Sequence, residues 1–206
     1  CNETIEIDPR AIDIAWEMHA ELGSQMPIYI ICGYRAKETN DMLRSIRGGQ
    51  AYKSQHISGK AIDLSFPDIP VRSLRYSAMI RERGGVGYYP TSAIPFVHID
   101  TGQVRSWPRV PHDELALLFP WGHSQHIASD GRMLEKGDLF EAKKRQPQLS
   151  QQVAQFFDLR RQPKKEINVA SNEFSQFFGQ SNIQNHSEND LTKDNGLQSR
   201  IFQKED

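Results

Sequence analysis

Apolar residues recur at three- and four-residue steps in the first part of the chain, as on one face of a helix. This stretch follows Asp8-Pro9, which reads as an N-cap followed by proline at the first helical position, and it runs to Gly23. The apolar face predicted for this helix consists of Ile12, Trp16, His19 and Leu22. A second amphipathic helix is predicted after Pro70, and a shorter one between Arg35 and Gly48.

Two other stretches alternate between apolar and polar residues, which is the pattern of half-buried strands. Residues 61–66 place Asp63 on the face opposite their aliphatic side chains. Residues 96–100 place His98 and Asp100 on the face opposite Val97 and Ile99. Further strand-like runs lie at 28–32, 86–89 and 104–107. Together these elements predict an α+β fold in which helices pack on one side of a small antiparallel sheet.

Changes in amino-acid composition divide the chain into three parts. Residues 5–110 carry the predicted sheet, and residues 111–145 are expected to form an appendage packed on it. From residue 146 to 206 the chain is rich in Gln, Asn, Ser and charge, which predicts a polar, disordered tail. Two similar pieces in that tail, 154–157 and 175–178, are either docking motifs for a protein partner or incidental hydrophobic residues.

The composition of the chain disfavours some classes of function. The chain has 25 Lys and Arg against 26 Asp and Glu, so it lacks the basic excess that drives nucleic-acid binding. No apolar run is long enough to cross a bilayer. Cys1 and Cys32 are the two cysteines, and Cys32 reads as a small buried hydrophobe, with a disulfide to Cys1 as the alternative. Cys1 is either the end of a trimmed fragment or the lipidated first residue of an exported lipoprotein.

His56, Asp63 and His98 form the candidate metal site. Imidazole and carboxylate are ligands that Zn²⁺ accepts, and three protein ligands with one open position define a catalytic zinc site. Asp63 and His98 stand on the faces of their strands opposite the aliphatic residues, so neighbouring strands can bring them together. Each residue taken alone has an ordinary explanation, as a solvated histidine or a hydrogen-bonding aspartate at a sheet edge.

The combination resembles a known family. The matching stretches are Gly33-Tyr34-Arg35, Glu38-Thr39-Asn40, Ser54-x-His56-x-x-Gly59-Lys60-Ala61-x-Asp63, Gly84-Gly85-Val86-Gly87-Tyr88-Tyr89 and Phe96-Val97-His98-x-Asp100-x-Gly102. With them the chain resembles the M15-type zinc peptidases, in particular their murein endopeptidase K-like branch. The resemblance covers roughly residues 5–110. It departs from the family at Ala36, where a serine is commoner.

The resemblance implies a zinc-dependent hydrolase of peptidoglycan stem peptides or crosslinks. Its ligands carry over to His56, Asp63 and His98, with one Zn²⁺ per chain. The arginine of the Gly-Tyr-Arg turn carries over to Arg35, which would hold a substrate carboxylate or a developing oxyanion; otherwise Arg35 is a surface salt-bridge residue. The resemblance also implies export to the periplasm or cell envelope and a native chain with a further segment before the first helix.

The sequence does not identify a single residue as the general base. The positions before His98 where relatives carry an acid or histidine hold Pro95 and Phe96. Asp100 is the nearest carboxylate in sequence. It is either the base, a partner that orients a ligand imidazole, or a turn cap. Three functions therefore remain open: an endopeptidase, a D,D- or L,D-carboxypeptidase, and a catalytically silent zinc-containing module that binds peptidoglycan.

Overall fold

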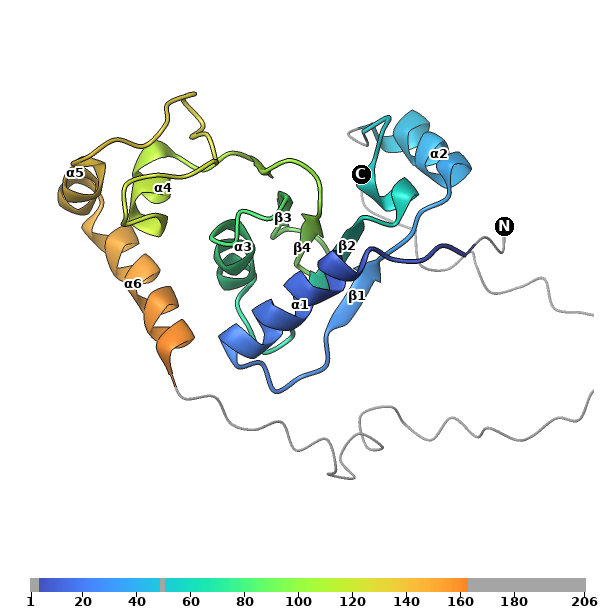
Figure 1. The fold of residues 1–206 in the computed structure, drawn as a ribbon, viewed down its shortest axis with the longest axis horizontal. Helices are drawn as coiled ribbons and strands as arrows, with labels where there is room; N and C mark the ends of the chain where they lie inside the picture. The colour runs from blue at the N-terminus through green and yellow to red at the C-terminus, as the bar shows by residue number, and fades with distance from the viewer. Residues whose placement is uncertain (1–3, 49–50, 163–206) are drawn as a thin grey trace, which may run out of the picture. The chain divides into compact units, whose positions relative to one another are not determined.

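The computed structural model describes residues 4–48 and 51–162, and in these residues it has the predicted α+β architecture (Figure 1). The helices are α1 Pro9–Leu22, α2 Lys37–Arg47, a short 3-10 turn η1 Gln55–Ser58, α3 Val71–Met79, α4 His112–Leu118, α5 Asp138–Arg145 and α6 Pro147–Arg161. The strands are β1 Tyr29–Cys32, β2 Ala61–Ser65, β3 Gly85–Tyr89, β4 Phe96–Asp100 and β5 Arg105–Trp107.

The strands form one sheet in the order β1-β2-β4-β3-β5. All neighbouring pairs are antiparallel except β3 and β5, which run parallel. Helices α1 and α3 pack on the aliphatic face of this sheet, whose core residues include Ile62, Leu64, Val97 and Ile99 (Figure 1). The polar residues of the central strands therefore share the opposite face.

Helix α1 begins where its sequence indicates, since the side chain of Asp8 accepts a hydrogen bond from the backbone of Arg10. Its buried face differs from the predicted one. Ile12 and Trp16 are exposed, whereas Ile14 and Met18 are buried against the core. The predicted residues His19 and Leu22 are buried, so the observed face is shifted from the predicted one and overlaps with it in part.

The region after residue 145 also differs from the prediction. The disordered tail was expected to begin at residue 146, but residues 147–161 form α6, in which Val153 and Phe156 are buried. The ring of Phe156 packs edge-on against Tyr76 of α3, with 5.4 Å between ring centroids. The piece 154–157 therefore docks on its own chain. Because glutamines separate the few apolar residues of α6, its helical periodicity is weak in the sequence. The other piece, 175–178, lies outside the described residues.

The expected appendage, residues 111–145, contains α4 and α5. Together with α6 these helices share the hydrophobic core of the sheet. Leu115 of α4, Ala142 of α5 and Val153 of α6 belong to the same cluster of buried side chains as the residues of the sheet. Polar contacts reinforce the packing, since Tyr76 donates a 2.8 Å hydrogen bond to Glu114. Within the described residues, none of the helices is long and apolar enough to cross a membrane.

Candidate functional site

One row of residues crosses the whole sheet on its polar face. Across neighbouring strands, Cys32 stands opposite Asp63, Asp63 opposite His98, His98 opposite Gly87, and Gly87 opposite Trp107. Residues directly opposite each other on one face of a sheet have their side chains in contact. The predicted residues Asp63 and His98 are thus brought together by strand register.

His56 reaches this row from η1, the turn that precedes β2. The turn ends at Gly59, whose φ of 66° is left-handed and where a Cβ would lie 2.6 Å from the carbonyl oxygen of Glu6. The ring of His56 then lies over β2, where its Nε2 is 3.2 Å from Asp63 Oδ1 and 3.1 Å from His98 Nδ1. His98 Nδ1 is 2.9 Å from the same Asp63 oxygen. All three side chains are buried.

The outer nitrogens of both imidazoles are held by acceptors. His56 Nδ1 donates a 2.6 Å hydrogen bond to the carbonyl oxygen of Gly33. His98 Nε2 donates a 2.9 Å hydrogen bond to Asp100 Oδ2. In the neutral rings, the proton on each outer nitrogen leaves a lone pair on the inner one. With both inner nitrogens deprotonated, His56 Nε2, His98 Nδ1 and Asp63 Oδ1 would point their lone pairs at a common centre.

The electrostatics of this centre favour positive charge. Burial lowers the pKa of His56, but hydrogen bonds with Asp63 and Cys32 outweigh burial and raise the pKa to about 10. Burial raises the pKa of Asp63, but its hydrogen bonds with the two histidines prevail and lower it to about 2. At neutral pH the cluster thus keeps the Asp63 carboxylate charged and favours the protonated His56 beside it, a proton that a metal ion bound here would displace.

Asp100 lies behind His98 and is fully buried. Its Oδ1 accepts hydrogen bonds from the backbone amides of Gly85 and Gly102, and both oxygens accept from Arg105. Burial raises the pKa of Asp100, but the hydrogen bonds from His98, Arg105 and the two amides outweigh it, so the pKa lies below its usual range. The carboxylate is therefore fully engaged in hydrogen bonds and does not line the cavity described below.

Arg35 is brought to the same cluster. One of its terminal nitrogens is 3.9 Å from Asp63 Oδ2 and 3.4 Å from Cys32 Sγ, and the other is 3.5 Å from Asn40 Oδ1. Its backbone amide donates to the carbonyl oxygen of His56, which ties the Gly-Tyr-Arg turn to η1. His123 and His126, outside the predicted site, are also outside the observed one: His126 Nε2 donates to the carbonyl oxygen of Met79.

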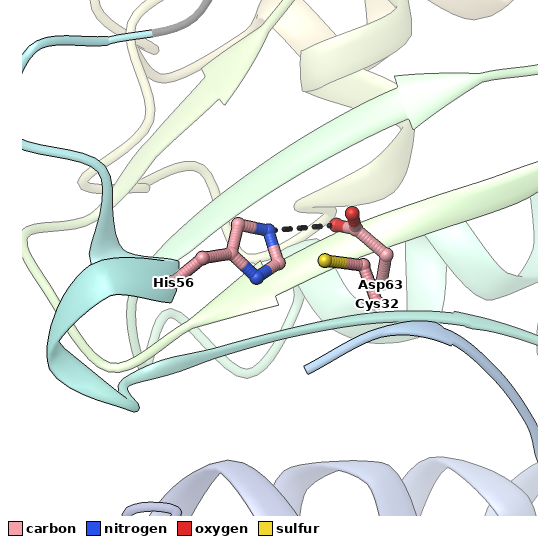
Figure 2. Close-up of side chains that lie close together, drawn as sticks. All are labelled: Cys32, His56 and Asp63. Atoms are coloured by element: carbon pink, nitrogen blue, oxygen red, sulfur yellow. Dashed lines mark ion pairs between the residues drawn. The ribbon is translucent and has the colours of Figure 1, made fainter. Parts of the chain in front are cut away.

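Cys32 was not predicted to belong to the site. It is a free thiol, half-buried, and lies beside His56 and Asp63 with their ligand atoms within 4.8 Å of one another (Figure 2). Burial raises the pKa of the Cys32 thiol, but His56 and Arg35 outweigh burial and lower it. The interpretation of Cys32 as a small buried hydrophobe is therefore wrong, since the thiol is half-buried and lies beside two candidate ligands. The one hint in the sequence was its position directly before the Gly-Tyr-Arg motif.

The cluster lies at the bottom of a cavity of about 380 Å³. Arg35, Lys53 and Arg105 contribute positive charge to its walls. Tyr89, Phe96 and Trp107 form an aromatic wall, in which Trp107 lies beside His98 with 5.0 Å between ring centroids and donates a 2.9 Å hydrogen bond to the Tyr89 hydroxyl. Sequence reasoning also missed this wall, although Arg105-x-Trp107 follows closely on the His98 motif.

Fold and site together define an α+β protein with a buried His–Asp–His cluster at the bottom of an open, cationic cavity. Comparison with known sequences identifies the family of the chain. The family Peptidase_M15_2, described as "Peptidoglycan L,D-endopeptidase MepK", matches residues 1–107, and the chain belongs to this family. The match covers the sheet, β5 included, and ends before α4.

Two relatives illustrate the similarity. The chain is 42% identical over 106 residues to the "Peptidoglycan L,D-endopeptidase MepK" of Escherichia coli strain K12, which is 52% of this chain and 57% of that protein. It is 42% identical over 110 residues to the "Probable peptidoglycan L,D-endopeptidase MepK" of Haemophilus influenzae, which is 53% of this chain and 58% of that protein. The chain thus spans little more than half the length of these relatives. No solved structure matches it.

Proposed function

We propose that this protein is a zinc-dependent endopeptidase that hydrolyses peptide bonds in peptidoglycan stem peptides or crosslinks. The observation that carries the proposal is the convergence of His56 Nε2, His98 Nδ1 and Asp63 Oδ1, which lie 2.9 to 3.2 Å from one another. Ligands of a tetrahedral zinc ion at bond lengths of about 2.0–2.2 Å lie about 3.3–3.6 Å apart. Shifts of a few tenths of an ångström would therefore fit the cluster to one Zn²⁺.

The fixed orientation of the imidazoles supports the same assignment. Ligand histidines in zinc sites donate their other ring proton to a carbonyl or carboxylate, which orients the ring and strengthens the ligand. Gly33 supplies the carbonyl for His56, and Asp100 supplies the carboxylate for His98. Asp100 is thus a positioning residue in this proposal, and its engaged oxygens argue against a role as general base.

Zinc bound here would polarise the scissile carbonyl and lower the pKa of water towards about 7. The side chains of the cavity would bind the substrate and exclude solvent. Arg35, next to Asp63, would bind the oxygen that gains negative charge, or a carboxylate of the substrate. Trp107, packed beside His98, would close one side of the site against solvent.

The cavity and the relatives support peptidoglycan peptides as the substrate class. Stem peptides carry free carboxylates, and Arg35 and Lys53 in the cavity wall could bind them. Both relatives are named for peptidoglycan L,D-endopeptidase activity. A substrate of this kind places the protein in the periplasm or cell envelope, where peptidoglycan is found.

The test is digestion of crosslinked muropeptides by the purified, zinc-loaded chain, followed by mass analysis. We expect crosslinked dimers to be converted to monomers, with about one zinc per chain. His98→Ala should lose the hydrolysis and bind zinc much more weakly, since it removes one of the ligands that hold the metal. His123→Ala, which changes an exposed histidine far from the row in sequence, is the matched control and should keep both. Full zinc content in His98→Ala would contradict the assignment.

A silent binding module is the second candidate. It is favoured by one observation: among the described residues that line the cavity, Asp63 is the sole carboxylate, so a separate acid that could act as general base is absent from that part of the site. A silent module would sediment with peptidoglycan and release no fragments. A carboxypeptidase, in contrast, would shorten stem peptides at their free ends and leave crosslinks intact, so the same mass analysis separates all three functions.

A further inference from the structure

The row across the sheet contains a residue that the His–Asp–His site does not use. Cys32 is the register partner of Asp63 on β1, just as His98 is its partner on β4. Asp63 therefore lies between the thiol of Cys32 and the imidazole of His98. The candidate ligand atoms of Cys32, His56 and Asp63 all lie within 4.8 Å of one another (Figure 2).

An irregularity in β1 places the thiol there. Tyr29 pairs with Ser65 and Ile30 with Leu64, so regular pairing would put Ile31 opposite Asp63. A bulge between Ile30 and Cys32 shifts the register by one residue and puts Cys32 there instead. Bulges in edge strands re-aim a side chain and are frequent beside active sites. Without this bulge, an isoleucine rather than a sulfur would face the cluster.

We propose that Cys32 is a fourth ligand of the metal held by His56, Asp63 and His98, a proposal that rests on the proposed zinc site. A zinc–sulfur bond is about 2.3 Å long, so sulfur and nitrogen ligands of one tetrahedral ion lie about 3.6 Å apart. The Cys32 sulfur already lies within 4.8 Å of the candidate ligand atoms of His56 and Asp63, so it would have to approach them by no more than about 1.2 Å. On binding, the thiol loses its proton to solvent and one metal–sulfur bond forms, with no oxidant or reductant consumed.

Arg35 supports this role through its contacts with the thiol and with Asp63. The same terminal nitrogen lies 3.4 Å from Cys32 Sγ and 3.9 Å from Asp63 Oδ2. A guanidinium that donates to a ligand sulfur orients it and balances its negative charge, as hydrogen-bond partners of ligands do in other metal sites. Four protein ligands make a closed site, in contrast to the open position of a hydrolytic one. Cys32 would therefore compete with substrate and water, and its release would open the site.

Cobalt substitution of the full chain tests the proposal without using activity. Cobalt bound to nitrogen and oxygen ligands gives visible ligand-field bands, and a cobalt–thiolate bond adds a charge-transfer band in the near ultraviolet. We expect the wild type and the control Cys1→Ser to show both features. Cys32→Ser should keep the visible bands and lose the charge-transfer band. Zinc should also protect Cys32 of the wild type from alkylation by iodoacetamide, with the modified residue located by mass analysis.

The outcomes separate this proposal from the one on which it rests. Visible bands with no charge-transfer band in the wild type, or alkylation of Cys32 at the same rate with and without zinc, would overturn the role of Cys32 and leave the three-ligand site standing. Failure of the wild type to bind cobalt or zinc at all would overturn both. In activity, Cys32→Ser should hydrolyse faster than the wild type at saturating zinc, and a loss as complete as that of His98→Ala would contradict the competing role.

Discussion

His98 and Asp100, two residues apart on β4, are joined by a 2.9 Å hydrogen bond from Nε2 to Oδ2, which aims the other nitrogen of His98 at Asp63. The hydrogen-bond donors around Asp100 show why its side chain serves this purpose. Arg105 and the amides of Gly85 and Gly102 hold the carboxylate in place and keep it ionised.

Asp100→Asn is therefore expected to weaken zinc binding by about 10–100-fold, as loss of such a partner does in other zinc sites. Turnover should be largely restored at saturating zinc. Competition with a chromophoric chelator measures the affinity, and Asp113→Asn, which changes a carboxylate paired with Arg145 away from the site, is the control. Unchanged affinity with kcat lower by about 10²–10⁴ would instead identify Asp100 as the base.

The aromatic wall depends on the absence of a side chain at Gly87. A Cβ there would lie 2.7 Å from the Trp107 ring. Gly87→Ala should displace the ring from His98 and destabilise the fold by about 1–3 kcal/mol, the usual cost of overpacking. Chemical denaturation and the fluorescence of Trp107 report the two effects. Gly33→Ala, whose Cβ would meet its nearest neighbour at an ordinary 3.9 Å, should cost less.

Helix α6 is expected to be part of the folded domain. Phe156 is buried against Tyr76, so Phe156→Ala should cost about 3–5 kcal/mol in the free energy of unfolding. Phe140→Ala, at a side chain that is 70% exposed, should change it by less than about 0.5 kcal/mol. Truncation after Lys144, which removes α6, should lower the melting temperature. Equal effects of the two substitutions would mean that α6 does not contribute to the core.

The N-cap of α1 predicts a dependence of stability on pH. The hydrogen bond from the Arg10 side chain, followed by the one from Thr101, lowers the pKa of Asp8 below its usual range. A lowered pKa in the folded state stabilises the protein above the unfolded pKa of about 4, and this contribution is lost as pH falls below it. Asp8→Ala should cost about 1 kcal/mol at neutral pH and less in acid. Asp13→Ala, at an exposed position of the same helix, should show no such trend.

Much of this structure follows from local sequence signals. The strands around Asp63 and His98 form because apolar and polar residues alternate with period two, and the same alternation places both side chains on the face away from the core. The start of α1 at Asp8 follows from the chemistry of an N-cap residue followed by proline. These features depend only on neighbours along the chain, so the sequence predicts them and, with them, three members of the candidate site.

The remaining features depend on contacts between segments far apart in sequence. The face of α1 that is buried, the docking of α6 on α3 and the position of Trp107 beside His98 are decided by how side chains fit against surfaces that exist only after folding. Cys32 shows this most clearly. Because β1 contains one extra residue at the bulge, Cys32 rather than Ile31 lies opposite Asp63. The strand pattern and the family resemblance indicate His56, Asp63 and His98 as candidate ligands from the sequence, whereas strand register, set by packing across the whole sheet, brings the Cys32 sulfur beside them.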